Sequence, residues 1–154
     1  MYRIHSLPVK ALLTLCSAFV LSGCTVTFVT QYDAIFDQEI SSTQKDVDTL
    51  LTKIASSPSV SDPKTSSVAY ASVAMDCAAI DTDFDGMNLR AGSHTDNSDT
   101  VNSVTKIKDS FDSLRSEYST DGVMRIAQAT DELKILNDEF QVIMAQEILK
   151  QQGK

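Results

Sequence analysis

Apolar residues recur at helical spacing in four segments of the chain, with polar residues on the opposite faces. In the first segment, steps of three and four residues keep the apolar side chains on one side of a helix. We expect this helix to begin after Thr30, its N-cap, and to end at residues 56–58. Its apolar face contains Tyr32, Phe36, Ile40, Thr43, Val47, Leu50 and Ile54.

The other three segments show the same spacing. The second contains Gly86, which costs a helix about 1 kcal/mol relative to alanine. A short turn over residues 119–122 separates the third segment from the fourth. No segment alternates apolar and polar residues over a sustained stretch, so the pattern predicts no strand. The apolar positions are Val73, Cys77, Ile80, Phe84, Met87 and Ala91 in the second segment, Val101, Val104, Ile107, Phe111, Leu114 and Tyr118 in the third, and Val123, Ile126, Thr130, Leu133, Leu136, Phe140, Ile143 and Glu147 in the fourth.

Four amphipathic helices with short connections predict an all-α domain over residues 31–154. We expect an antiparallel four-helix up-down bundle, because short connections place each apolar face beside another in the same chain. The alternative is a parallel coiled-coil oligomer through the first helix, whose apolar seam is heptad-like. That oligomer would leave three further apolar faces to be buried.

Residues 1–23 are typical of a signal peptide. Arg3 and Lys10 make the start basic, and residues 11–21 form an apolar run. This run is too short to span a bilayer as a mature helix, which needs about 20 residues, but it suits the core of a secretory signal. The run ends in Leu21-Ser22-Gly23-Cys24, a tetrad that resembles the lipobox of bacterial lipoproteins.

The lipobox resemblance implies cleavage before Cys24 and attachment of acyl chains such as palmitate to this cysteine. Two or more acyl chains anchor a protein stably, at about 0.8 kcal/mol per buried CH2. Residues 24–30 would then form a lipid-anchored tether. Thr25 follows the cysteine where aspartate tends to mark inner-membrane retention, so we expect the outer membrane and a periplasm-facing domain. The alternative is an ordinary secreted protein with a chance cysteine after its cleavage site.

The charge balance limits the partners of the mature chain. Cleavage would remove two of the 13 basic residues and none of the 21 acidic ones, so the net charge would change from −8 to −10. A chain this acidic repels the phosphates of nucleic acids, and we expect no nucleic-acid partner. It also repels anionic membrane surfaces. The acyl chains on Cys24 must therefore hold the protein to the membrane.

Both ends of the mature chain carry further family-like patterns. Phe28-Val29-x-x-Tyr32-Asp33-Ala34 follows the lipid cysteine, and Asn137-x-x-Phe140-x-x-Ile143-x-x-x-Glu147-x-x-Lys150 lies near the C-terminus. Together with the lipobox, these patterns resemble a family of small, helical bacterial lipoproteins of uncharacterised function. The resemblance implies the cellular address and the helical architecture, and it implies no catalytic residue.

One motif suggests a metal site. Asp81, Asp83 and Asp85 followed by Gly86 match the first half of an EF-hand calcium loop. The bidentate glutamate that closes such a loop at its twelfth position is replaced by Gly92. The motif is therefore a weak candidate for calcium. In the competing interpretation, Phe84 lies in the core while the aspartates face solvent.

Other chemistry is poorly supplied. Cys77 lies on an apolar face and is expected to be a small buried thiol, and His94 falls in a polar connection. A transition-metal site needs several such ligands, so we expect neither a transition metal nor a cofactor. A Cys77–His94 nucleophile pair is the remote alternative. Arg90 and Arg125 adjoin apolar positions, and we expect each to pair with an acid from another helix.

These observations favour a non-enzymatic envelope lipoprotein with a structural or protein-interaction role. Its partner would be another protein of the cell envelope. The alternative function is a ligand-binding module, either for calcium at the Asp81 motif or for an apolar ligand held between the helices. An enzyme is disfavoured because the sequence offers no plausible catalytic set.

Overall fold

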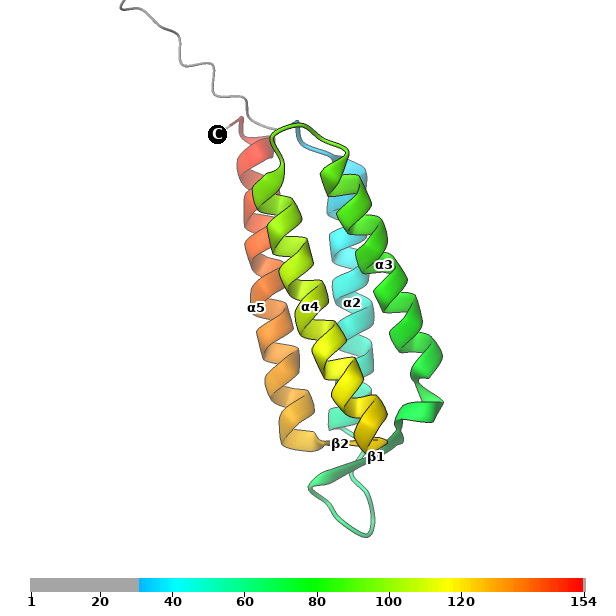
Figure 1. The fold of residues 1–154 in the computed structure, drawn as a ribbon. Helices are drawn as coiled ribbons and strands as arrows, with labels where there is room; N and C mark the ends of the chain where they lie inside the picture. The colour runs from blue at the N-terminus through cyan, green and yellow to red at the C-terminus, as the bar shows by residue number, and fades with distance from the viewer. Residues whose placement is uncertain (1–30, 154) are drawn as a thin grey trace, which may run out of the picture.

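The computed structural model describes residues 31–153, and within them the protein is mostly helical. Four α-helices and one small two-stranded sheet make up this part of the chain. The helices lie side by side (Figure 1). In chain order the elements are α2 (Ala34–Ala55), β1 (Thr65–Ala69), the 3-10 turn η1 (Tyr70–Ser72), α3 (Ala74–Gly92), α4 (Ser98–Asp121), β2 (Val123–Arg125) and α5 (Ile126–Gln151).

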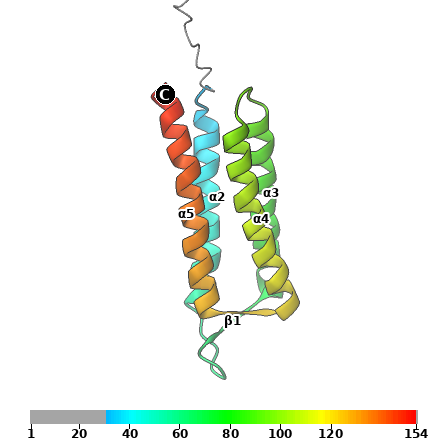
Figure 2. The same cartoon turned by 60° about the vertical axis from the view of Figure 1, so that its left-hand side comes forward.

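The molecule has two different ends. The start of α2, the connection between α3 and α4, and the end of α5 lie together at what we call the upper end (Figure 1). The β1–β2 sheet lies at the opposite, lower end. Helix α2 packs against α3 and α5, and α4 packs against the same two helices. Figure 2 shows the four helices and the sheet at their lower end from a second direction.

The predicted apolar faces form the core. Each helix contributes buried residues at the expected spacing. Three phenylalanines meet in the core: the ring centroid of Phe84 lies 5.6 Å from that of Phe111 and 5.9 Å from that of Phe140. All three side chains are buried. Because α3 and α5 both cover α2, its heptad-like seam is filled within one chain. The coiled-coil alternative is not needed to bury it.

Several helix limits differ from the sequence-based expectation. Asp33 caps α2, accepting hydrogen bonds from the backbone N–H groups of Ile35 and Phe36; Thr30 lies outside the described residues. Helix α3, by contrast, continues past Gly86 to Gly92, as the apolar position at Ala91 predicted. Helix α4 extends through most of the expected turn and ends at Asp121. Gly122 caps it, with a φ of 73° in the left-handed region that glycine adopts without strain.

The prediction of no strand is wrong at the lower end. β1 and β2 pair antiparallel, with Thr65 opposite Arg125 and Ala69 opposite Val123. The fourth helix therefore begins at Ile126 and not at Val123. Strands of five and three residues are too short for their alternation to stand out from the sequence. In β2 only the central residue, Met124, is buried.

The sheet is fixed to the helices by two tyrosines. The Tyr118 hydroxyl on α4 donates a hydrogen bond of 2.7 Å to the carbonyl of Val68. Its ring packs edge-on against Tyr70, with centroids 5.4 Å apart. Burial raises the pKa of Tyr118 to about 12. The phenol therefore stays protonated and keeps donating at neutral pH.

Candidate functional site

The three residues of the calcium motif lie within a continuous helix. Asp81, Asp83 and Asp85 all belong to α3, where successive residues are turned by about 100°. Asp81 and Asp85 reach Lys108 of α4, whereas Asp83 lines a groove against α2 together with Asp46. The three carboxylates do not converge on one point. Among residues 31–153 no group of three or more His, Cys, Asp or Glu side chains is placed to hold a metal ion.

Asp81 instead belongs to an ion-pair cluster between α3 and α4. Its carboxylate contacts the Lys108 ammonium and lies 2.9 Å from the Arg115 guanidinium. Asp112 bridges the same two cations, at 3.3 Å from Lys108 and 3.2 Å from Arg115. The hydrogen bond from Lys108 lowers the pKa of Asp81. The expectation that these aspartates only face solvent is wrong for Asp81, whose side chain is 24% exposed.

Asp83 has the opposite electrostatic environment. Partial burial and the nearby carboxylate of Asp46 raise its pKa above the ordinary value. The groove that it lines between α2 and α3 has a volume of about 370 Å³ and also contains Asp76 and Lys53. Lys53 lies 4.0 Å from Asp76. Three carboxylates and one ammonium group line the groove, so it favours a cationic over an anionic occupant.

Arg90 pairs with acids across two helices, as expected. Its guanidinium lies 3.2 Å from Asp33 and 3.0 Å from Glu39. The ring of His94 adds a contact of 3.2 Å to the same Asp33 oxygen. Burial opposes ionisation of Asp33, but its hydrogen bonds to Phe36, His94, Ile35 and Arg90 outweigh this effect and lower its pKa to about 2. The network links the start of α2 to the end of α3.

A second polar network at the upper end is buried. Glu147 is 1% exposed, and its carboxylate lies 2.5 Å from the Lys150 ammonium. Lys150 also donates to Asn97 and Thr100 at the start of α4, over 2.6 and 2.7 Å. The sequence pattern correctly placed Glu147 on the apolar face but did not identify its partners. Lysine three residues later in the same helix was the available signal.

Cys77 and His94 do not form a nucleophile pair. Cys77 is buried in the core, as expected, and burial raises the pKa of its thiol. His94 lies just beyond the other end of α3, seventeen residues away, which corresponds to about 25 Å along a helix. The residues cannot share a proton directly at that separation. The thiol is therefore a packing group.

One void in the core is too small for an apolar ligand held between the helices. A void lined by Leu50, Cys77, Phe111 and Met124 has a volume of about 10 Å³. That volume is close to the minimum for one water molecule, and a small organic ligand needs a cavity of about 300 Å³ or more. At this place the side chains of the core therefore pack closely and leave no room for such a ligand.

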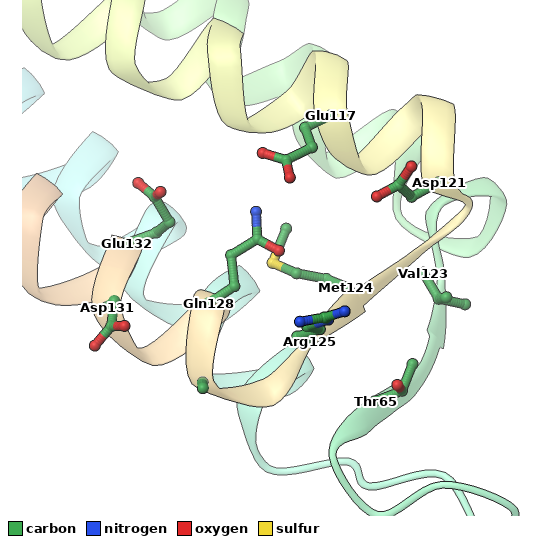
Figure 3. Close-up of a pocket in the computed structure, with 10 residues that line it drawn as sticks. Thr65, Glu117, Asp121, Val123, Met124, Arg125, Gln128, Asp131 and Glu132 are labelled. Atoms are coloured by element: carbon green, nitrogen blue, oxygen red, sulfur yellow. The ribbon is translucent and has the colours of Figure 1, made fainter.

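A concave site that we call the acidic cleft lies at the lower end (Figure 3). It has a volume of about 600 Å³ and lies where α4 ends and α5 begins. Glu117 of α4 and Gln128 of α5 point toward one another across it (Figure 3). The lining residues are Thr65, Glu117, Asp121, Val123, Met124, Arg125, Ala127, Gln128, Asp131 and Glu132.

Four carboxylates and one guanidinium set the electrostatics of this acidic cleft. Burial, followed by the charges of Glu117, Asp131 and Glu139, raises the pKa of Glu132. Crowded carboxylates of this kind attract cationic groups and repel anions. Arg125, expected to pair across helices, lies on β2 and is exposed on the cleft lining. The arrangement suits a cationic group such as an ammonium or a guanidinium.

The acidic cleft could not be found from the sequence, because β2 creates it. The three residues of β2 separate the end of α4 from the start of α5, whereas the expected short turn would have brought these helix ends together. The four acids come from two helices and are spread over sixteen positions. They formed no recognisable motif.

Cys24, the predicted lipidation site, lies outside the described residues, as do the signal peptide and the tether. Among residues 31–153 no helix is both long enough and apolar enough to cross a membrane. Comparisons of the chain with protein-family models, with curated proteins and with solved structures found no match.

Proposed function

We propose that the chain is a lipid-anchored, periplasm-facing envelope lipoprotein with a non-enzymatic structural or protein-interaction role. The observation that carries the proposal is the tetrad Leu21-Ser22-Gly23-Cys24 at the end of an apolar run. Acyl chains on Cys24 would hold the protein, most simply at the outer membrane. A helical domain that begins at Ala34 would follow after a short tether.

We also propose the antiparallel up-down order for the four helices. Two features support it. Helices that follow one another in the chain pack together, and so do the first and the last. The α3–α4 connection lies at the upper end and the β1–β2 sheet at the lower end (Figure 1). This arrangement would place the acidic cleft at the end away from the tether, where a second envelope protein could reach it.

Replacement of Cys24 by serine tests the anchor. The variant lacks the sulfur that the acyl group requires, so it should incorporate no fatty-acid analogue and should leave the membrane fraction. Cys77→Ser is the matched control, since Cys77 is buried, and it should be labelled like the wild type. Equal labelling of the Cys24→Ser variant and the wild type would contradict the proposal.

The second candidate is a calcium-binding module at Asp81, Asp83 and Asp85. The sequence motif favours it, but the ion pairs of Asp81 compete with a metal ion for the same oxygens. Titration with millimolar calcium, followed by calorimetry and by the melting temperature, separates the two candidates. Heat release and a rise in melting temperature that Asp81→Asn abolishes would favour the calcium module.

A further inference from the structure

The outward face of α5 changes character along its length. Over the last ten residues of α5, nearly three turns, the exposed residues are mostly apolar: Val142, Ala145, Ile148 and Leu149, with Gln151 the polar one. The large ones are 53%, 52% and 49% exposed, in the order Val142, Ile148, Leu149. At 100° per residue, Ala145 falls between Ile148 and Leu149, so the four residues form one continuous surface. We call it the upper patch.

The same face is polar nearer the lower end. Thr130, Asp131, Lys134, Asp138 and Gln141 are all exposed there. Ile135 is the apolar exception, at 47% exposed. One helix therefore presents an apolar surface near the upper end and a charged surface beyond it. Two further apolar residues are exposed at the upper end: Ile35 in the first turn of α2 and Leu89 in the last turn of α3.

The length of the tether determines what can reach the upper patch. Eight residue steps separate Cys24 from Tyr32, and an extended chain covers at most about 3.6 Å per residue. The upper end would therefore lie within about 29 Å of a membrane in which Cys24 is anchored. Helix α5, with 26 residues, is about 39 Å long. The upper patch would thus stay within reach of the lipid, whereas the acidic cleft, near the other end of α5, could lie much farther away.

Several carboxylates near the upper patch are held in ion pairs within the protein. Glu147 pairs with Lys150, and Asp33 and Glu39 both pair with Arg90. Carboxylates held in ion pairs are repelled less by the negative surface of a membrane than free ones. A second copy of this chain would have to bring together two acidic molecules, which electrostatic repulsion opposes.

From these observations we propose that the upper patch is a lipid contact, with Val142, Ile148 and Leu149 reaching the boundary between headgroups and acyl chains. This inference rests on the proposed anchor at Cys24. Apolar side chains of interfacial helices enter that boundary by about 5–10 Å. The contact would hold the domain in one orientation, with the acidic cleft directed away from the bilayer.

The absence of tryptophan from the sequence allows a direct test. Leu149→Trp places a fluorophore in the upper patch, and Ile135→Trp is its matched control. Both sites lie on α5 with similar exposure, and fourteen residues place them on the same side of the helix, about 21 Å apart. The mature lipoprotein would be reconstituted into phosphatidylcholine vesicles with plain or brominated acyl chains, since bromine quenches indole at short range.

We expect brominated lipid to lower the emission of the Leu149→Trp variant at least about twofold, given the insertion depth of an interfacial helix. The Ile135→Trp variant should change little. Equal emission of the Leu149→Trp variant in both lipids would overturn the proposal, and so would equal quenching of the two variants. A dimer that Leu149→Glu dissociates would also overturn it, because the occupant would then be a second copy.

The mass of the N-terminal peptide that contains Cys24 shows separately whether this residue carries acyl chains. If Cys24 carries no acyl chain, the proposed function fails. The chain beginning at Cys24 can then be coupled through that thiol to a maleimide phospholipid, since Cys77 is buried. The same quenching comparison then tests the upper patch without the natural anchor.

Discussion

Asp33 shows how much of the structure can depend on one side chain. It caps α2 and forms contacts to Arg90 and His94 from the end of α3. A carboxylate in this position satisfies backbone N–H groups and complements the positive end of the helix dipole. The residue thus joins a local requirement of α2 to the packing of α2 against α3, through a contact between residues 57 positions apart.

The lowered pKa of Asp33 predicts a loss of stability in acid. Its pKa is about 2 in the folded protein against 3.8 for a free aspartate, so its charge stabilises the fold above pH 3.8 and loses this effect as the pH falls toward 2. Asp33→Asn keeps a capping oxygen but carries no charge. We expect urea unfolding to show the variant less stable at pH 7, with the difference shrinking below pH 4. A difference that stays constant down to pH 2 would contradict the assignment.

Phe140 tests the core at the residue scale. It is buried and stacked against Phe84, so truncation to alanine removes apolar contacts and leaves a cavity. We expect Phe140→Ala to lower the free energy of unfolding by about 3–5 kcal/mol. Val60→Ala, at a fully exposed loop position, is the control and should change it by less than about 0.5 kcal/mol. Equal losses in the two variants would contradict the described core.

Among the elements, the sequence predicted the helices well and the lower end poorly. The buried positions of α3 are those read from the spacing, namely Cys77, Ile80, Phe84, Met87 and Ala91. Long periodic stretches repeat the same information several times, which is why they can be recognised. The sheet depends on contacts between Thr65 and Arg125, sixty residues apart in the chain, and no local pattern carries that information.

In the candidate site, too, some contacts could be predicted from the sequence and others could not. The pairing of Arg90 with acids of another helix was predictable, because a bundle places polar residues beside its apolar seam opposite one another. The pairing of Asp81 was not, since Lys108 and Arg115 lie 27 and 34 residues away. A calcium-loop motif within a helix is misleading because the motif describes spacing and not backbone conformation.

Gly122 is the residue on which the junction of α4 and β2 depends. Its φ of 73° is strained for any side chain, and its carbonyl accepts a hydrogen bond of 2.8 Å from the N–H of Tyr70. We expect Gly122→Ala to destabilise the protein by about 1 kcal/mol or more, measured by chemical denaturation. The matched control is Gly92→Ala at the end of α3, where a methyl group meets open space. This control should be neutral or slightly stabilising, and the opposite order of the two variants would contradict the fold at this junction.

At the scale of the whole molecule, the two ends differ in chemistry. The upper end combines exposed apolar side chains with carboxylates held in ion pairs, and the lower end carries the acidic cleft. If Cys24 is anchored as proposed, these ends would give the protein a defined orientation, with one end for the membrane and one for a partner. The helical core would then act as the spacer between the two ends. The apolar faces of the four helices form this core by packing against one another.

The central claim is that Cys24 is the first residue of the mature protein and carries acyl chains. The direct measurement is the mass of the N-terminal peptide of the protein purified from bacterial membranes. We predict a peptide that begins at Cys24, with the added mass of a diacylglyceryl group and, on the freed amine, a fatty acyl chain. A peptide that begins elsewhere, or an unmodified Cys24, would contradict the account.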